Sequence, residues 1–190
     1  ILVDFRGFDT YGEIIVLGIA AVIIYALTET LLSSSVRARL LNRPVEEKAG
    51  DAHPLLMVVA TRVMMPIVLM IGVYIFLRGH NEPGGGVVGG LIAASAVAIY
   101  GIAVGVSPVR RAIRFHPMAI SGFGLFMATI AGLMSLFAGV PFMTGLWVYP
   151  TVFGVELKLS TTLVFDIGVY LVVLGSIAST ALALEERERD

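Results

Sequence analysis

An acidic residue, Asp166, lies within the apolar stretch LVFDIGVYLV near the C-terminal end of the chain. A carboxylate at the middle of a membrane-spanning helix costs about 2.5–3.5 kcal/mol on insertion scales, so it should face protein or water rather than lipid. Thr162 and Tyr170 lie four residues to either side and would share its helical face. This polar stripe could line an ion path, and the alternative is an interhelical hydrogen bond to a neighbouring protein chain.

A second acidic group lies in the N-terminal stretch DFRGFDTYGE. Asp9 and Glu13 are four residues apart, so they share a face if the stretch is helical. A carboxylate pair at this spacing could pass a proton or hold a cation, with Arg6 tuning its charge. The alternative is structural, because Thr10 followed by Glu13 matches a capping box that would start a helix at this point.

A glycine-rich run, RGHNEPGGGVVGGL, joins two apolar stretches. In a helix, Gly85 and Gly89 would form one ridge of small residues, and Gly86 and Gly90 would form another. Such ridges let helices approach closely in lipid, so we interpret the run as a helix-packing surface. It lacks the Gly-Lys-Ser/Thr sequence of a phosphate-binding loop, and we therefore expect no nucleotide.

These residues must be held by elements that suit a membrane. Apolar residues make up 57% of the 190-residue chain and charged residues only 14%, against about 25% charged in a typical soluble domain. Lipid leaves only helices or closed barrels to satisfy the backbone, and continuous rather than alternating hydrophobicity favours helices. We predict an all-α polytopic membrane protein with five transmembrane helices, at residues 14–32, 55–77, 85–106, 117–140 and 159–184.

Basic residues are distributed unevenly between the two ends of these spans. Ten lie at one end and three at the other, and the positive-inside rule makes the richer end cytoplasmic, together with the C-terminus. The ten are Arg37, Arg39, Arg43, Lys48, Arg62, Arg110, Arg111, Arg114, Arg187 and Arg189, and the three are Arg6, Arg78 and Lys158.

A polar and highly charged segment, SSSVRARLLNRPVEEKAGD, separates the first span from the other four. It is typical of a cytoplasmic linker. We therefore divide the chain into residues 1–50, with one transmembrane helix, and residues 51–190, with a four-helix membrane unit. The chain begins with Ile-Leu-Val-Asp rather than Met, and we interpret it as lacking an upstream part.

The composition argues against several classes of function. The chain has no cysteine and no HExxH motif, and its three histidines all fall in predicted loops, so no Ser–His dyad lies in a span. A net charge of −1 gives no support for a nucleic-acid partner. We predict no enzymatic activity and no cofactor. Because no inverted repeat is visible, we expect other subunits, as well as lipid, to be the partners.

Two parts of the chain resemble a known family. ILVDFRGFDTYGEIIVLGIAA resembles the extreme C-terminal part of the large A subunit of Mrp-type multisubunit sodium/proton antiporters. YIFLRGHNEPGGGVVGGLIAASA and LVFDIGVYLVVLG resemble the B subunit of the same complex. The chain thus looks like an A-subunit tail fused to a B subunit. It departs from the family's PGGGF motif at Val87, where the family has phenylalanine.

The resemblance implies a function that composition alone does not show. It implies exchange of cytoplasmic sodium for external protons in a bacterial cell membrane, so the transported ions are Na⁺ and H⁺. Asp166 matches a carboxylate implicated in the family's sodium path, where it would contact sodium transiently, and Asp9 and Glu13 match an acidic pair implicated in transport. The family is related to the membrane arms of hydrogenases and of complex I. A structural subunit of a redox-driven pump is therefore the second hypothesis.

Overall fold

The computed structural model describes residues 2–33, 55–79, 84–148, 151–152, 155–156 and 159–189. The predicted linker after Ser33, and the domain boundary placed at residue 50, lie outside these residues. Helices account for most of what is described. They are α1 (Leu2–Ser33), α3 (Leu55–Arg78), α4 (Gly86–Val104), α5 (Val106–Ala112), α6 (Pro117–Phe137) and α7 (Thr161–Arg189).

All of these helices except α5 are long and apolar enough to cross a membrane. The predicted all-α membrane class with five spans is therefore confirmed for the described part of the chain. α1 begins at Leu2 rather than near residue 14. Thr10 and Glu13 consequently lie inside the helix and not at its start, so the capping-box interpretation is wrong. α4 ends before the predicted residue 106, because Gly105 adopts φ 97°, a conformation that favours glycine and breaks the helix.

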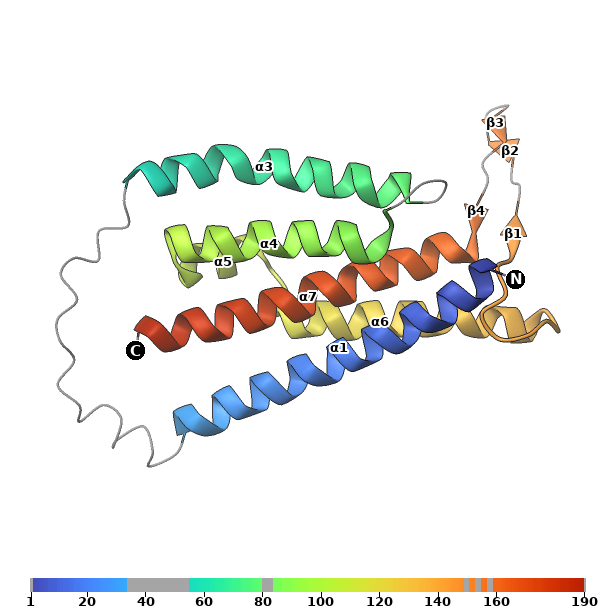
Figure 1. The fold of residues 1–190 in the computed structure, drawn as a ribbon, viewed down its shortest axis with the longest axis horizontal. Helices are drawn as coiled ribbons and strands as arrows, with labels where there is room; N and C mark the ends of the chain where they lie inside the picture. The colour runs from blue at the N-terminus through green and yellow to red at the C-terminus, as the bar shows by residue number, and fades with distance from the viewer. Residues whose placement is uncertain are drawn as a thin grey trace.

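Four short strands lie between α6 and α7, at the end of the bundle that holds the N-terminus (Figure 1). β1 (Trp147–Val148) pairs with β4 (Leu159–Ser160), and β2 (Thr151–Val152) pairs with β3 (Val155–Glu156), both antiparallel. The sequence analysis did not anticipate them, because strands of two residues carry no readable alternation of hydrophobicity. The backbone N–H of Leu146 donates to the Thr161 hydroxyl and the Thr161 N–H donates to the Leu146 carbonyl, each at 3.0 Å. These two bonds fix where α7 begins.

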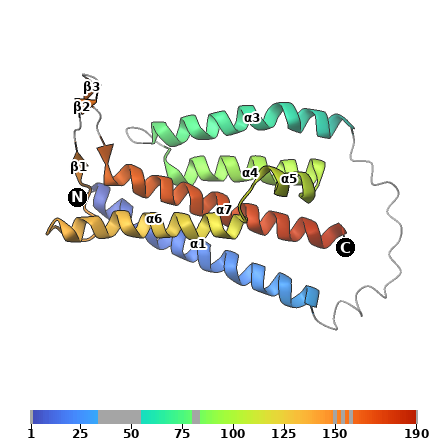
Figure 2. The same cartoon turned by 180° about the vertical axis from the view of Figure 1, so that it is seen from behind.

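α7 is the central helix of the bundle. It packs against α6, α4 and α1, and α4 in turn packs against α3. Figures 1 and 2 show this order from two opposite sides, with α3 at one edge and α1 at the other. The C-terminus and the end of α1 lie at the end of the bundle opposite the strands.

Small residues allow α6 and α7 to make close backbone contact. A Cβ added to Gly168 would lie 2.6 Å from the Gly124 carbonyl oxygen, and a Cβ on Gly124 would lie 2.6 Å from the Gly168 carbonyl oxygen. Further along, the buried hydroxyl groups of Ser121 and Ser176 form a hydrogen bond of 2.9 Å. Close approach of small residues with occasional hydroxyl bonds is how helices associate in lipid.

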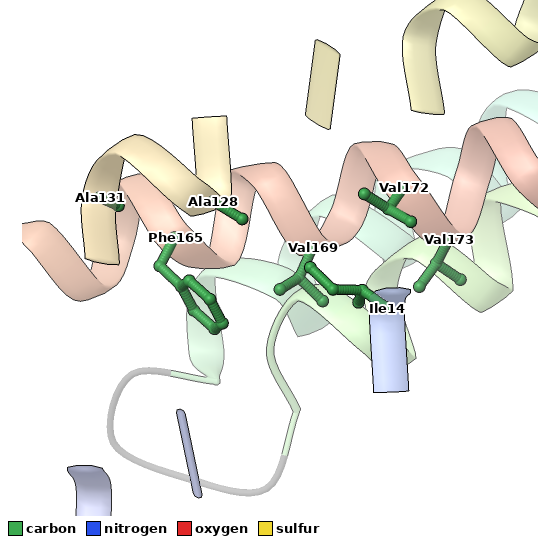
Figure 3. Packing of buried hydrophobic residues seen from close by; sticks show 7 residues of the cluster. All are labelled: Ile14, Ala128, Ala131, Phe165, Val169, Val172 and Val173. Carbon is green, nitrogen blue, oxygen red and sulfur yellow. The ribbon is translucent and has the colours of Figure 1, made fainter. Parts of the chain in front are cut away.

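A cluster of buried residues in the half of the bundle nearer the strands joins α1 to α6 and α7. Figure 3 shows Ile14 of α1 beside Val169 and Val173 of α7, with Ala128 of α6 facing the same cluster. Ile14 is only 1% exposed. The first helix is therefore an integral part of the bundle, even though the sequence divides it from the other four.

A hydrogen bond also joins α1 to α6. The hydroxyl groups of Tyr11 and Thr129 lie 2.8 Å apart, and Thr129 also donates to the Leu125 carbonyl at 2.7 Å. Tyr11→Phe should lower the unfolding free energy by only about 0.6 kcal/mol, the mean for hydrogen bonds between membrane helices, because Thr129 keeps its backbone acceptor. Equilibrium unfolding in mixed micelles measures the change in unfolding free energy. Tyr74→Phe, on the exposed face of α3, is the control and should change nothing, whereas a loss of about 3 kcal/mol in Tyr11→Phe would contradict this account.

Candidate functional site

Asp166 lies in the second turn of α7, beside the start of α4. Its side chain is half-buried, and its Oδ2 atom lies 3.8 Å from the position that a Cβ on Gly85 would occupy. Gly85 is the N-cap residue of α4 and has no side chain to cap the helix. The first N–H groups of a helix lack intrahelical partners and carry a partial positive charge. The carboxylate is therefore placed next to a polar helix end.

Two glycines bring the α4 backbone onto α7 at this point. A Cβ on Gly86 would collide with the Asp166 carbonyl oxygen, and a Cβ on Gly90 would lie 2.9 Å from the Tyr170 carbonyl oxygen. Gly85 itself adopts φ 94°, in the region that favours glycine. Glycine at these positions is what allows the α4 N-terminus to reach the level of Asp166.

Gly85 and Gly89, predicted to form the other ridge, face different helices, because Gly85 is the N-cap residue of α4 and lies beside Asp166 of α7. A Cβ on Gly89 would lie 2.9 Å from Phe76 Cβ and 3.0 Å from the Gly72 carbonyl oxygen, both on α3. Gly86 and Gly90 thus contact α7, while Gly89 contacts α3. α4 is held between the two by small residues on separate faces.

The three residues of the predicted polar stripe have different surroundings. The Tyr170 ring packs edge-to-face on Phe76, with ring centroids 5.4 Å apart, where α3, α4 and α7 meet. The Thr162 hydroxyl forms a hydrogen bond with Ser160, and its methyl group lies 3.2 Å from the position of a Cβ on Gly145. The Asp166 side chain therefore lies beside the start of α4 and the Tyr170 ring lies against α3, whereas Thr162 faces the segment that precedes α7.

The acidic pair on α1 faces away from this bundle. Asp9 and Glu13 lie within the membrane-spanning part of α1, Gly7–Thr30, and both side chains are exposed. The opposite face of α1 carries Tyr11 and Ile14, which contact α6 and α7. The structure therefore does not bring Asp9 and Glu13 together with Asp166. Within this chain, the acidic pair on α1 and Asp166 on α7 are therefore separate sites.

The described residues contain no group of three or more His, Asp or Glu side chains that could hold a metal ion. A cavity between α1 and α6 is lined by apolar residues such as Ile15, Val22 and Leu125, and none of the predicted site residues lines it.

Sequence reasoning missed two sets of residues that position the site. The first is Tyr11, whose ring lies against the ring of Phe165, with centroids 6.4 Å apart. Phe165 directly precedes Asp166 in α7. The second is the glycine set on the α6–α7 contact, Gly124, Gly168 and Gly175. Gly124 and Ala128 match the small-xxx-small pattern, and Gly168 and Gly175 are seven residues apart, so the signal was present in the sequence.

Two protein families match the chain in sequence. The family described as "Domain related to MnhB subunit of Na+/H+ antiporter" matches residues 56–179, and the family of the E subunit of MBH matches residues 1–38. The two matches do not overlap, and they fall on the four-helix part and on the first helix respectively. Together with the relatives and the structure described next, they confirm the resemblance to Mrp-type antiporters.

Individual relatives extend these matches. A Rhizobium meliloti protein, named as a probable A/B subunit of a K⁺/H⁺ antiporter, is 35% identical over 201 residues, which cover 97% of this chain and 20% of that protein. The B subunit of the Bacillus subtilis Na⁺/H⁺ antiporter is 36% identical over 145 residues, covering 75% of this chain and 99% of that protein. A solved structure of the Mrp complex from Dietzia sp. DQ12-45-1b contains a chain with a TM-score of 0.77 and 30% identity, over 100% of this chain and 20% of that chain. This chain thus spans about a fifth of the length of the first and third proteins.

Proposed function

Because the chain belongs to the family of domains related to the MnhB subunit of Na⁺/H⁺ antiporters, we propose that it is a membrane subunit of a multisubunit cation/proton antiporter. In this proposal it helps to line the path of sodium ions and protons, and it is a transporter component rather than an enzyme. The observation that carries the proposal is the family match over residues 56–179, which includes the Asp166 helix and the glycine-rich start of α4. Na⁺ and H⁺ are the transported species, with no other cofactor.

Asp166 is the residue of this chain that we place in the ion path. Its half-buried carboxylate lies on the central helix, at the start of α4. A carboxylate among membrane helices is retained where it binds a proton or a cation, because it is costly elsewhere. Thr162 and Tyr170 flank it at one helical turn on either side. We assign to them the role of polar neighbours of the path, and to Asp166 a transient contact with sodium.

Asp9 and Glu13 support a site shared with other subunits. Two exposed carboxylates on a membrane-spanning helix cannot remain in contact with lipid at low cost. Their face of α1 is therefore covered by other protein chains or by water in the assembled complex. We propose that they form an acidic step of the path at a boundary between subunits, and that the other antiporter subunits supply the remaining contacts.

The directions of the helices and the positions of the basic residues give the proposed arrangement in the membrane. α1, α4 and α7 run in one direction and α3 and α6 in the other, so the C-terminus and the basic residues of α5 lie at the end opposite the strands (Figure 1). We propose that this end is cytoplasmic and that the complex resides in the bacterial cell membrane. Residues 1–50 would then be an A-subunit tail and residues 51–190 a B-subunit unit.

The nature of the cation needs a direct test. The Bacillus subtilis relative is named for Na⁺, whereas the Rhizobium meliloti relative is named for K⁺. A second candidate function, a structural subunit of a redox-driven ion pump, is favoured by the MBH family match to residues 1–38. The two functions differ in energy source. An antiporter moves cations when only a pH gradient is imposed, and a redox-driven pump requires an electron donor.

Neutralising the acidic pair tests the proposal. In inverted vesicles that carry the intact complex and an imposed pH gradient, Asp9→Asn and Glu13→Gln should each lower Na⁺-dependent proton efflux by about 100-fold, the lower end for loss of a positioned proton-transfer group. The double variant should lose little more, because residues of one pathway do not contribute additively. A pH-sensitive dye follows the efflux on addition of Na⁺, K⁺ or Li⁺. Glu29→Gln, an exposed acid further along α1, is the control and should leave the rate unchanged; normal efflux in the double variant would refute the role of the pair.

A further inference from the structure

An apolar groove runs between α1 and α6. Its volume is about 350 Å³, and its walls include Ile15, Gly18, Ile19, Val22, Met118 and Gly122. Gly18 and Gly122 face open space, since a Cβ on either would meet no atom within 4 Å. The hydroxyl of Ser121, a polar group in the lining, is already bonded to Ser176. A cavity with satisfied polar groups and aliphatic walls takes an apolar occupant rather than water.

The length of the groove suits an extended apolar chain. α1 rises about 12 Å from Ile15 to Ile23 at about 1.5 Å per residue, and aliphatic side chains line this stretch on both helices. Both walls lie in membrane spans, where lipid chains are the surrounding solvent.

One end of the groove is aromatic and basic. Beyond Ile23 and Met118, the rings of Tyr25 and His116 pack edge-to-face with centroids 5.6 Å apart. Arg114 and Phe115 directly precede His116, and both side chains are exposed, Phe115 at 73%. α6 begins partway along α1 and α7 rather than level with their ends, so this segment lies beside the bundle and not beyond it (Figure 1).

Charge complementarity then identifies the headgroup. Arg111, on α5, is exposed as well, and the described residues offer neither Arg111 nor Arg114 an ion pair. A guanidinium group binds phosphate through paired N–H donors. Aromatic rings beside cationic side chains are characteristic of the membrane interface, where one part of a ligand is apolar and the other charged.

We propose that this groove binds an anionic phospholipid, with one acyl chain between α1 and α6 and the phosphate at Arg114. Arg111 adds to the positive potential around the headgroup. The lipid fills the gap between α1 and α6, at the point where Gly18 of α1 and Gly122 of α6 have no side chains to fill it. This inference is independent of the ion path, because none of the residues assigned to that path lines the groove.

Photo-crosslinking in the intact complex tests the proposal. The complex is reconstituted in phosphatidylcholine vesicles that contain a trace of phosphatidylglycerol with a diazirine in its acyl chain, and parallel vesicles carry labelled phosphatidylcholine instead. Crosslinks should map to residues 15–23 and 118–125 and should favour phosphatidylglycerol. Arg114→Gln should reduce that preference by about fivefold, the effect of one arginine on an anionic lipid. Arg62→Gln, on the exposed face of α3, is the matched control and should leave it unchanged.

Filling the groove gives the second arm of the experiment. Gly122→Leu and Gly18→Leu place side chains in open space and should remove the crosslinks, while Gly12→Leu, equally open but outside the groove, should keep them. Crosslinks that persist in Gly122→Leu, or equal capture of both lipids, would overturn the proposal. A photoreactive amino acid in place of Val22 should capture lipid. If it captures another protein of the complex instead, the groove is a protein interface and the lipid assignment is wrong.

Discussion

Replacing Asp166 with asparagine is expected to lower Na⁺-dependent proton flux by at least about 100-fold, the lower range for loss of a positioned proton-transfer group. Asparagine keeps the size of the side chain and one acceptor oxygen, but its NH₂ group replaces the other oxygen and it can neither carry a negative charge nor take up a proton. Because the side chain lies beside Gly85 at the start of α4, an isosteric change should leave the packing of α4 on α7 intact. The measurement is dye-monitored flux in vesicles, normalised to the amount of assembled complex.

Two further variants separate a role in transport from a role in structure. Asp166→Glu keeps the carboxylate and should recover part of the flux, even though the longer side chain fits less well. Glu29→Gln removes an exposed acid from α1 and should leave the flux unchanged. Full exchange in Asp166→Asn would mean that this carboxylate serves only as a hydrogen-bonding group between helices.

The second large effect is expected at Gly168, on the α6–α7 contact. A Cβ there would lie 2.6 Å from the Gly124 carbonyl oxygen and 2.7 Å from the Ala128 nitrogen. Both are backbone atoms, so relief requires the helices to separate rather than a side chain to rotate. Gly168→Ala should therefore lower the unfolding free energy by about 3 kcal/mol or more, at the upper end of the cost of overpacking. Thermal unfolding of the purified protein in detergent measures the change.

A matched substitution on the facing helix provides the control. Gly122 of α6 faces open space, so Gly122→Ala meets no atom within 4 Å. Alanine also has the higher helix propensity, and stability should stay the same or rise by up to about 1 kcal/mol. Equal stability of Gly168→Ala and Gly122→Ala would show that the close contact between α6 and α7 is absent in the membrane.

The architecture was predictable because the bilayer simplifies the problem. A run of about 20 apolar residues can satisfy its backbone in lipid only as a helix, so the positions of the apolar runs along the chain predict the five spans. The helix ends were less accessible. α1 extends back to Leu2 through Asp9 and Glu13, because a helical backbone satisfies its own hydrogen bonds whatever the side chains. Gly105 ended α4 through its backbone conformation, which the apolar pattern does not reveal.

The candidate site was predictable only in part. The sequence singles out Asp166, which the structure places beside the start of α4, and the Tyr170 ring one turn further on lies against Phe76 of α3. A spacing of four residues grouped Thr162 with them, but Thr162 lies at the first turn of α7, where the preceding strand, β4, provides its partner, Ser160. The contact between Tyr11 and Thr129 depends on two segments 118 residues apart, and no local pattern encodes it.

The acidic pair shows a different limit of sequence reasoning. Helical spacing places Asp9 and Glu13 near each other, but it does not decide which way they face. The structure settles this through Ile14 and Tyr11, which contact α7 and α6 and so turn the acids outward. In the proposed function, other chains or water cover these acids, and this sequence does not encode the chemistry of that cover. That is why the proposed path has one acid inside the bundle and a pair at its boundary.

The central claim is that Asp166 exchanges protons or cations with a hydrated path. The most direct test is an electron cryo-microscopy structure of the assembled complex in sodium buffer, at a resolution that shows ordered water. The account predicts water or a cation within hydrogen-bonding distance of the Asp166 carboxylate, with a continuous polar route from it to a membrane surface. A carboxylate enclosed by apolar side chains, with no water beside it, would contradict the account.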